Sequence, residues 1–377
     1  MRILAVNVGS SSLKLDVWET DISRALIRLE ARGIGREHSS IVENENVVAR
    51  QPIANHEVAL DALMQRLPDA DKIIRIGHRV VHGGSSYRAA TWLNETVMDD
   101  LRVLVPLSPL HLPPALTVMD ACRRQFPDIA QAAVFDTAFH ASLHARAYTY
   151  AIPFAWRDAG VRRYGFHGIA CADIVAQLDK ELRKRTVILH LGAGCSATAV
   201  YEGESIDTTM GFTPLEGLVM ATRGGDIDPG ALLYVQRKFD LSPQQMDHML
   251  NERSGLLALS GFSADMRDVL QRQDEKSKLA VEVFCYRAAK AVGSLAIALG
   301  GLDQIIFSGG IGEHSAIVRA SISILLLGLG VVIDDERNKA NDSVISSSNS
   351  EVEVRIMAVD EGRQIARETL LLKADTE

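Results

Sequence analysis

The sequence predicts an α/β protein made of two domains, and three observations support this prediction. The chain has 377 residues, which is more than twice the usual length of one domain. Strand-like and helical patterns are mixed from one end to the other. Residues 3–15 and 187–200 share one pattern, an apolar run, a turn of small residues and a second apolar run. This echo indicates duplication of one domain, but strand–glycine–strand hairpins are also common in unrelated proteins.

Four short apolar runs predict strands of the core. They are rich in β-branched residues, and each ends at a polar or glycine turn. They lie at residues 3–8, 132–135, 187–191 and 305–307.

Helical patterns lie between these strands. Apolar residues in 60–67 follow the i, i+3, i+4, i+7 spacing of an amphipathic helix. Ser242, Pro243 and Gln245 give another helix an N-cap, a proline at its first position and a capping-box residue. Residues 278–300 are rich in Ala, Leu and Val, which predicts a long and mostly buried helix.

Composition narrows the class of protein. Apolar residues make up 47% and charged residues 23%, as in a globular protein with a large core. The net charge of −8 argues against a nucleic-acid partner. None of the four cysteines forms a CxxC pair, and no signal peptide or apolar run of about 20 residues is present. We therefore expect a cytoplasmic protein without a membrane partner.

Two small-residue loops are candidate phosphate sites. Asn7 lies near the end of a predicted strand, and Gly9, three serines and then Lys14 come after it, so backbone N–H groups, hydroxyls and a cation could meet a phosphate. Residues 307–314 place glycines between a strand and a helical run. Each stretch could equally be a plain turn. The GxGxxG and Walker-type motifs are absent, so a dinucleotide fold and a P-loop are disfavoured.

The run 77–84 carries Arg79 beside two histidines and ends in glycines. Strand alternation puts Arg79 and Val81 on one face and the histidines on the other. An arginine next to a valine suits a small carboxylic acid, since the guanidinium binds the oxygens and the valine packs on the alkyl end. The alternative is an exposed strand with a surface arginine, and no third ligand beside the histidines indicates a metal.

Asp136 stands at the carboxyl end of a predicted core strand, a preferred place for chemistry in α/β folds. Aspartate is also a good helix N-cap, and the local sequence favours that interpretation.

Two further segments carry candidate cationic groups. His167 is flanked by Phe166 and a glycine, so the backbone can position it to donate to a phosphoryl oxygen, although lone histidines are often structural. Residues 207–229 form a long stretch rich in glycine, hydroxyls and acids, which is typical of a functional loop. Within it, Arg223 could neutralise charge on a transferring phosphoryl group.

Taken together and in this order, the motifs resemble those of the acetate kinase family over essentially the whole chain. The matching strings are NVGSSSLK from 7, GHRVVHGG from 77, FDTAFH from 135, RRYGFHG from 162, DTTMGFTPLEGLVM from 207, TRGGDIDPG from 222, SGLLALSG from 254 and GGIGE from 309.

The resemblance implies a fold and a division of the chain. It implies two duplicated domains of the kind found in actin, sugar kinases and heat-shock ATPases, which have a ribonuclease H-like fold, around an interdomain cleft. Residues 1–140 would bind the acyl substrate and phosphate and would be completed by the C-terminal helix at 362–377. Residues 141–361 would bind the nucleotide. A homodimer is implied as well.

The resemblance also implies roles for single residues. Asp136 would be the catalytic acid, and His167 and Arg223 would stabilise the transition state. Because a carboxylate substrate is already ionised at pH 7, we expect Asp136 to orient the metal shell or Arg223 rather than to remove a proton. The other roles fall into three sets. The substrate-binding set is Arg79, Val81, Leu110, Phe166 and Pro214; the nucleotide-binding set is Lys14, His190, Leu191, Gly192, Ala193, Gly194, Asp265, Met266, Arg267, Gly309, Gly310, Ile311, Gly312 and Glu313; and the metal-binding set, for Mg²⁺ or Mn²⁺, is Asn7 and Glu361.

The sequence departs from the family pattern mainly on the nucleotide side. Ala193 replaces an asparagine in the phosphate loop, His314 replaces an asparagine, and Glu361 is followed by Gly362 instead of a second glutamate. Loss of an amide donor at position 193 would cost roughly 1–3 kcal/mol if the phosphate acceptor stayed unpaired. ATP affinity and the identity of the phosphoryl donor are therefore open.

The resulting expectation is a reversible kinase that transfers the ATP γ-phosphoryl group to acetate or propionate, giving an acyl phosphate and ADP. Alternatives are a kinase of the same fold acting on another acid, on a sugar or with another donor, and an impaired family member. A heat-shock-type ATPase is disfavoured because no residues remain for a peptide-binding domain.

Overall fold

The computed structural model describes residues 1–373, which form two compact units. The first unit is built from three separate stretches, Met1–Ala141, Gly168–Asp173 and the residues from Asp360 onward. The second contains Ser142–His167 and Ile174–Val359. Within residues 1–373, no helix combines the length and apolar character needed to cross a membrane.

The first unit is organised around a mixed sheet in the order β5-β4-β3-β2-β1-β6-β8-β7. Its strands are β1 (Arg2–Gly9), β2 (Ser12–Glu19), β3 (Ala25–Arg32), β4 (Ser40–Glu43), β5 (Asn46–Arg50), β6 (Ile73–Val80), β7 (Thr91–Trp92) and β8 (Ala130–Phe135). Strands β1, β6 and β8 run parallel, so their carboxyl ends meet at one edge of the sheet.

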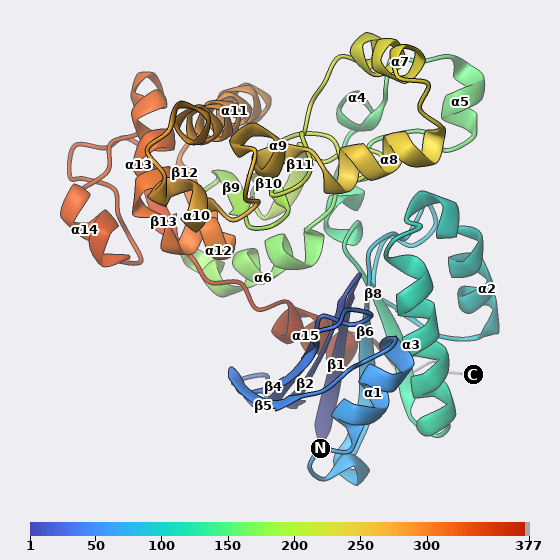
Figure 1. The fold of residues 1–377 in the computed structure, drawn as a ribbon. Helices are drawn as coiled ribbons and strands as arrows, with labels where there is room; N and C mark the ends of the chain where they lie inside the picture. Colours follow the sequence, from blue (N-terminus) through green and yellow to red (C-terminus); the bar gives the residue numbers. More distant parts are fainter. Residues whose placement is uncertain (374–377) are drawn as a thin grey trace. The chain divides into compact units, whose positions relative to one another are not determined.

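Helices cover both faces of this sheet. They are α1 (His56–Met64), α2 (Glu95–Val103), α3 (Leu112–Gln125), the first part of α6 (Gly168–Leu178) and α15 (Glu361–Leu371), with 3₁₀ turns η1 (Ala70–Lys72), η2 (Val105–Leu107) and η3 (Ala138–Ser142). Helices α1 and α3 lie on one face and α15 on the other (Figure 1). Alternation along β1 explains this layering, because Leu4 and Val6 pack with the first group whereas Ile3 and Ala5 pack with Ile365 of α15.

The second unit has a five-stranded sheet in the order β11-β10-β9-β12-β13. Its strands are β9 (Arg185–Leu191), β10 (Cys195–Tyr201), β11 (Glu204–Thr208), β12 (Gln304–Ser308) and β13 (Glu353–Ile356). A hairpin of β9 and β10 has β12 parallel beside it, as the hairpin of β1 and β2 has β6. The two units therefore share the core topology that the sequence echo predicts.

Helices of the second unit vary in length from one turn to seven. They are α4 (Ala145–Tyr148), α5 (Phe154–Asp158), the end of α6, α7 (Pro229–Lys238), α8 (Pro243–Glu252), α9 (Gly255–Ser260), α10 (Met266–Gln271), α11 (Glu275–Leu299), α12 (Gly309–His314), α13 (Ala316–Leu325) and α14 (Asp335–Ala340), with η4 (Asp179–Glu181) and η5 (Leu327–Leu329).

Most of the predicted elements are confirmed, and two differ in detail. The four strands are present, and α8 has the predicted capping box between Ser242 and Gln245. Helix α11 was predicted to be mostly buried, but Leu279, Tyr286 and Ile297 point to solvent. The predicted turn at 307–314 is itself helical from Gly309, directly after β12.

Candidate functional site

The candidate residues of the first unit gather where β1, β6 and β8 end. Asn7 lies near the end of β1, Arg79 near the end of β6, and Asp136 directly after β8. Glu361, the first residue of α15, completes the group. Neighbouring parallel strands bring these side chains together although they are far apart in the sequence.

Four side chains form a continuous chain of polar contacts there. Arg79 donates to Oδ2 of Asp136 from Nε at 3.1 Å and from Nη2 at 2.6 Å. Its Nη1 donates to Oδ1 of Asn7 at 3.2 Å, and Nδ2 of Asn7 donates to Oε2 of Glu361 at 2.6 Å. The N-cap interpretation of Asp136 does not hold, because its carboxylate binds Arg79.

Burial and neighbouring charges together shift the pKa values of Asp136 and Arg79. Asp136 is almost fully buried, and its pKa is raised by burial and by Glu361, while Arg79 lowers it. Burial alone would lower the pKa of Arg79, but Asp136 and Glu361 outweigh burial and raise it. Arg79 therefore stays cationic between two carboxylates, so a further cation would be attracted to this group.

One oxygen of this group also lacks a protein partner. Oδ1 of Asp136 is buried and accepts no hydrogen bond from any described residue. Such an orphan acceptor is costly, and a metal ion or a metal-bound water would satisfy it. Carboxylate and amide oxygens are the donors that Mg²⁺ prefers. The residues present therefore fit the metal that the sequence predicts, although in this structure the Asn7 oxygen accepts from Arg79.

Residues 1–373 contain no cluster of three or more His, Cys, Asp and Glu side chains that could enclose a metal. This is compatible with Mg²⁺, which is usually held by one or two carboxylates together with waters and substrate phosphates.

His78 of β6 has a structural role, because its Nε2 lies 2.8 Å from Oε1 of Gln131 and burial lowers its pKa to about 4.

The remaining candidates of the first unit differ in exposure. Lys14 is exposed and lies directly opposite Asn7 in the register of β1 and β2, so both side chains leave the same face. Val81 is buried just beyond β6, whereas Leu110 is 41% exposed in the segment before α3. The predicted strand face of Arg79 and Val81 is therefore shorter than expected, because β6 ends at Val80.

In the second unit, His167, His190 and Arg223 converge on the turn between β9 and β10. The rings of His167 and His190 are 4.8 Å apart between centroids. A Cβ built on Gly194 would lie 3.1 Å from Nε2 of His167 and 3.6 Å from Nη2 of Arg223. Glycine at 194 thus leaves open the space that these two donors face.

Backbone and hydroxyl groups hold these side chains in place. His167 has a left-handed φ of 60° and directly precedes α6. Its Nδ1 lies 3.0 Å from Oγ of Ser196, and Nδ1 of His190 lies 3.1 Å from Oγ of Ser308. Neither serine was predicted from sequence. Ser308 lies beside His190 because β12 pairs with β9, and Ser196 of β10 meets His167 only in the folded chain.

Arg223 is a mostly buried cation without a carboxylate partner. Its Nη1 donates to the carbonyl of Pro214 at 3.1 Å, and it forms no ion pair with any side chain in the described part of the chain. Burial lowers its pKa, although a guanidinium remains charged at neutral pH. A buried cation of this kind is suited to bind an anion. Phe166 is buried in the same unit.

A cavity of about 990 Å³ lies beside α10 and α12, and its lining is mostly apolar. Its lining includes Gly192, Ala193, Asp265, Met266, Arg267, Leu270, Gly310, Ile311, His314 and Ile317. Arg267 and Asp265 form an ion pair at 2.6 Å on its wall. The volume and lining suit a nucleoside.

The other nucleotide candidates of the second unit do not line this cavity. Leu191 is fully buried in β9, so only its backbone is available. Gly309 has a φ of 74° and no room for a Cβ beside Leu191, and its N–H donates to Oε1 of Glu313 at 3.0 Å. Gly312 is buried in α12.

Arg319 supports the end of α12 and was not predicted from the sequence. It is fully buried and donates from Nη1 to the carbonyls of Gly312 and Glu313 at 2.9 and 2.8 Å. Its Nε donates to Oδ1 of Asn338 at 2.7 Å. An arginine on an amphipathic helix gives no sign in sequence that it faces inward.

Comparison with known proteins gives one consistent family. A model of the acetokinase family matches residues 2–367. The chain is 40% identical to an acetate kinase of Carboxydothermus hydrogenoformans, covering 99% of both chains, and 39% identical to an acetate kinase of Clostridium botulinum, covering 98% of both.

Solved structures agree with these sequence relatives. A propionate kinase from Francisella tularensis has a TM-score of 0.93 and 36% identity, covering 99% of this chain and 100% of that one. An acetate kinase from Porphyromonas gingivalis has a TM-score of 0.88 and 31% identity, covering 98% of both chains.

Proposed function

Because the chain belongs to the acetokinase family, we propose that it reversibly transfers the γ-phosphoryl group of ATP to the carboxylate of acetate. The products are acetyl phosphate and ADP. The observation that carries this proposal is Arg223, a mostly buried cation that lacks a carboxylate partner and faces the open turn at Gly194 beside His167. Such a group is built to meet an anion that the protein does not supply.

The chemistry needs charge neutralisation more than proton transfer. A carboxylic acid with a pKa near 4.3 is already ionised at neutral pH, so it needs no general base. Two like charges about 4 Å apart repel each other by roughly 4 kcal/mol at an effective dielectric constant near 20. Arg79 would bind the acetate carboxylate, and Arg223 and His167 would stabilise the phosphoryl group during in-line transfer.

The proposed metal site lies in the first unit, which would also bind the acyl substrate. Asn7 and Glu361 would hold Mg²⁺ or Mn²⁺, and the orphan oxygen of Asp136 would face its coordination shell. When bound, the ion supplies positive charge next to the phosphate oxygens.

Asp136 acts as an orienting carboxylate in this proposal. Its Oδ2 accepts two hydrogen bonds from Arg79, which fixes the guanidinium in one plane. From sequence, we expected Asp136 to orient Arg223 or the metal shell. The contacts of its carboxylate favour Arg79 together with the metal shell.

The nucleotide would occupy the cavity beside α10 and α12. Met266 and Ile311 would pack against adenine, and the glycines at 192, 194 and 310 would allow backbone N–H groups to approach the phosphates. Ala193 and His314 in this lining keep a second phosphoryl donor, such as pyrophosphate, as an alternative outcome of the test.

The acid itself is short. Val81, Leu110, Phe166 and Pro214 would contact its alkyl end, so acetate and propionate are both candidates. One extra methylene changes binding by only about 0.8 kcal/mol. The structural relative named as a propionate kinase supports including propionate.

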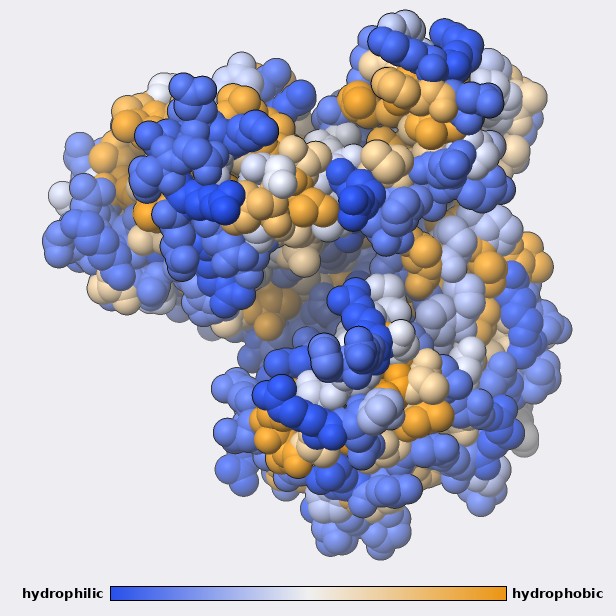
Figure 2. Space-filling model, viewed as in Figure 1, coloured by the Kyte–Doolittle hydropathy of each residue, from blue (hydrophilic) through white to orange (hydrophobic). Residues whose placement is uncertain are grey.

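A cytoplasmic location and a homodimer complete the proposal. Apolar surface gathers over α7 (Figure 2). Its exposed apolar side chains include Leu233 and Tyr234, with Ile227 and Phe239 just outside the helix. Such a patch supports an interface with a second copy of the chain.

The test is an assay of acyl phosphate, trapped as the hydroxamate. Acetate, propionate and butyrate are each offered with ATP and with pyrophosphate, with and without Mg²⁺. We expect acetyl phosphate from acetate, ATP and Mg²⁺, and a loss in kcat of about 100-fold or more for Arg223→Ala. Arg337→Ala, an exposed arginine of α14 in the same unit, is the matched control and should keep full activity. Absence of acyl phosphate with every acid and donor would reject the proposed function.

A further inference from the structure

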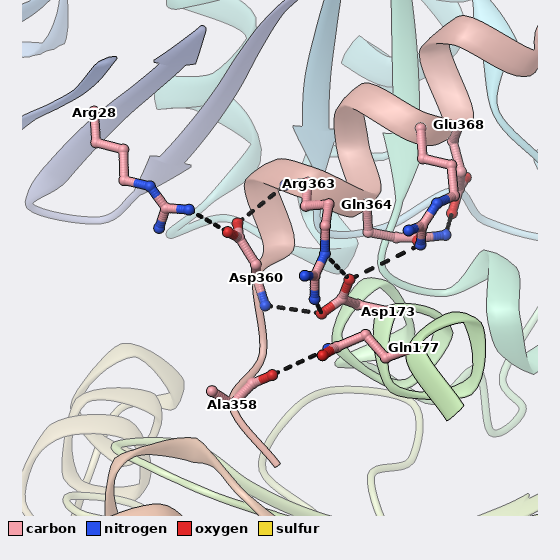
Figure 3. A network of polar contacts seen from close by, with 9 residues as sticks. Arg28, Asp173, Gln177, Ala358, Asp360, Arg363, Gln364 and Glu368 are labelled. Carbon is pink, nitrogen blue, oxygen red and sulfur yellow. Dashed lines mark hydrogen bonds and ion pairs between the residues drawn. The ribbon is translucent and has the colours of Figure 1, made fainter. Parts of the chain in front are cut away.

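Asp173, on α6, has a fully buried carboxylate that the proposed chemistry does not use. Arg363 of α15 donates to it from both edges of the guanidinium, from Nε to Oδ1 and from Nη2 to Oδ2, each at 2.8 Å. Arg367, one turn further along α15, lies 3.9 Å away from Oδ1. Figure 3 shows the Asp173 carboxylate where these contacts meet.

The same carboxylate also holds the residue before α15. Its Oδ2 accepts a hydrogen bond from the backbone N–H of Asp360 at 2.9 Å. Asp360 in turn caps α15, since its Oδ1 accepts from the N–H of Arg363 at 3.0 Å, and Arg28 pairs with its other oxygen. One buried side chain thus binds both residue 360 and residue 363, and Glu361 lies between them (Figure 3).

The position of Glu361 matters because of what it touches. Its Oε2 accepts from Asn7, which accepts from Arg79, which binds Asp136. A shift of the first turn of α15 would therefore carry Glu361 away from this group. Displacements of about 1 Å at a reacting centre can cost about 100-fold in rate.

The start of α6 is itself fixed to Asp136. The N–H of Gly168 donates to the carbonyl of Asp136 at 2.8 Å, and a Cβ at Gly168 would collide with that carbonyl. Residues 168–173 therefore contact Asp136 at one end and the beginning of α15 at the other. This short segment spans two parts of the candidate metal site within the first unit.

We propose that Asp173 is a positioning residue that, through Arg363 and the Asp360 N–H, holds Glu361 where it can bind the metal. The inference rests on the proposed function for the metal, and it assigns Asp173 no contact with substrate. A bidentate arginine–carboxylate pair defines direction as well as distance, which suits this role. Groups that orient metal ligands typically change metal affinity 10- to 100-fold when they are removed.

The test compares Asp173→Asn, Arg363→Met and the double variant in the full-length protein. Mn²⁺ binding in the presence of ADP is measured by electron paramagnetic resonance, and hydrogen exchange is measured at the amide of Asp360. We expect each single variant to weaken Mn²⁺ binding about tenfold and to speed exchange at Asp360. The double variant should be no worse than the singles, because both remove the same contact.

Arg123→Met is the matched control, since it breaks an arginine–carboxylate pair with Glu95 in the same unit without touching Asp173 or α15. It should keep wild-type Mn²⁺ affinity. The KM for acetate should stay near wild type in Asp173→Asn, while the apparent KM for Mg²⁺ rises. A general loss of structure would instead change both constants together with the melting temperature.

Wild-type Mn²⁺ affinity and wild-type exchange in Asp173→Asn would overturn the proposal, as would additive effects in the double variant. If Asp173→Asn does not fold, Arg363→Lys decides, because it keeps the charge and loses the fork; unchanged Mn²⁺ affinity in that variant rejects the proposal. The wild type could make no acyl phosphate while Asp173→Asn still binds Mn²⁺ more weakly than the wild type. In that case the proposed function is rejected and the positioning role of Asp173 stands.

Discussion

Single buried charges of the first unit are neutralised to different degrees. Asp136 has Arg79 at 2.6 Å, and Asp173 has Arg363 at 2.8 Å. Asp16 on β2 is half-buried, and it forms no ion pair with any side chain of residues 1–373. Burial raises the pKa of Asp16 to about 6, with Arg28 opposing that effect and Asp360 adding to it. Asp16 therefore has a cost when ionised that the paired carboxylates avoid.

This cost predicts a pH-dependent gain in stability for Asp16→Asn. The folded pKa lies above the unfolded value, so the stability that protonated Asp16 contributes is fully present below about pH 4 and is lost as pH rises through about 6. The variant should therefore exceed the wild type by up to about 3 kcal/mol at pH 7 to 8 and match it near pH 4. Urea unfolding followed by tryptophan fluorescence between pH 4 and 8 measures the difference.

Asp71→Asn, at an exposed aspartate of the same unit, is the control and should show no such trend. A stability difference for Asp16→Asn that does not change with pH would contradict the prediction.

At the scale of elements, α15 supplies one face of the first unit's core. Ile365 and Ala366 pack with Ile3 and Ala5 of β1. Gly77 of β6 has no room for a Cβ because Thr369 of α15 lies against it. The close packing shows that α15 is part of the core of this unit. It begins one residue before the helix expected at 362–377, whose last four residues lie outside the described part of the chain.

Truncation of one α15 side chain should therefore destabilise the first unit. Ile365→Ala removes a fully buried side chain and should lower the free energy of unfolding by about 2–5 kcal/mol. Leu371→Ala, on the same helix but 72% exposed, should change it by less than about 0.5 kcal/mol. Denaturant unfolding of both variants tests this prediction. If Ile365→Ala changed the free energy of unfolding as little as Leu371→Ala, α15 would be only loosely packed on the sheet.

The site residues that could be predicted from sequence are brought together by strand pairing, and those that could not are brought together by helix packing. Arg79 and Asp136 stand at or beside the carboxyl ends of strands, so their convergence follows from parallel pairing. Asp173 and Arg363 are 190 positions apart and meet only because α6 and α15 pack together. Local patterns do not indicate such a contact, so the cationic groups could be predicted from sequence but the residues that hold them could not.

At the scale of the whole molecule, the chain passes between its two units after Ala141, His167, Asp173 and Val359. The α/β class with two units of related core topology, and the acetokinase family, are both confirmed. The segment 168–173 belongs to the first unit, which the sequence did not indicate.

The proposed homodimer gives a prediction at this scale. Light scattering after size exclusion should give about twice the chain mass of 41.1 kDa. Leu233→Glu in α7 should shift the protein towards monomer, because a buried charge without a partner opposes association. Ile297→Glu, at an 83% exposed position of α11 in the same unit, is the control and should leave the mass unchanged. A wild-type monomer, or a Leu233→Glu dimer of equal strength, would contradict the proposed interface.

The discontinuous first unit has a consequence for how the protein is made. Its sheet strands leave the ribosome early, but the α15 residues that cover Ile3 and Val134 are translated only after residues 174–359. At about 5–20 residues per second, that apolar face would stay uncovered for roughly 10 to 40 s. We expect nascent chains to need shielding by a chaperone during this interval, and the second unit to reach its native state first.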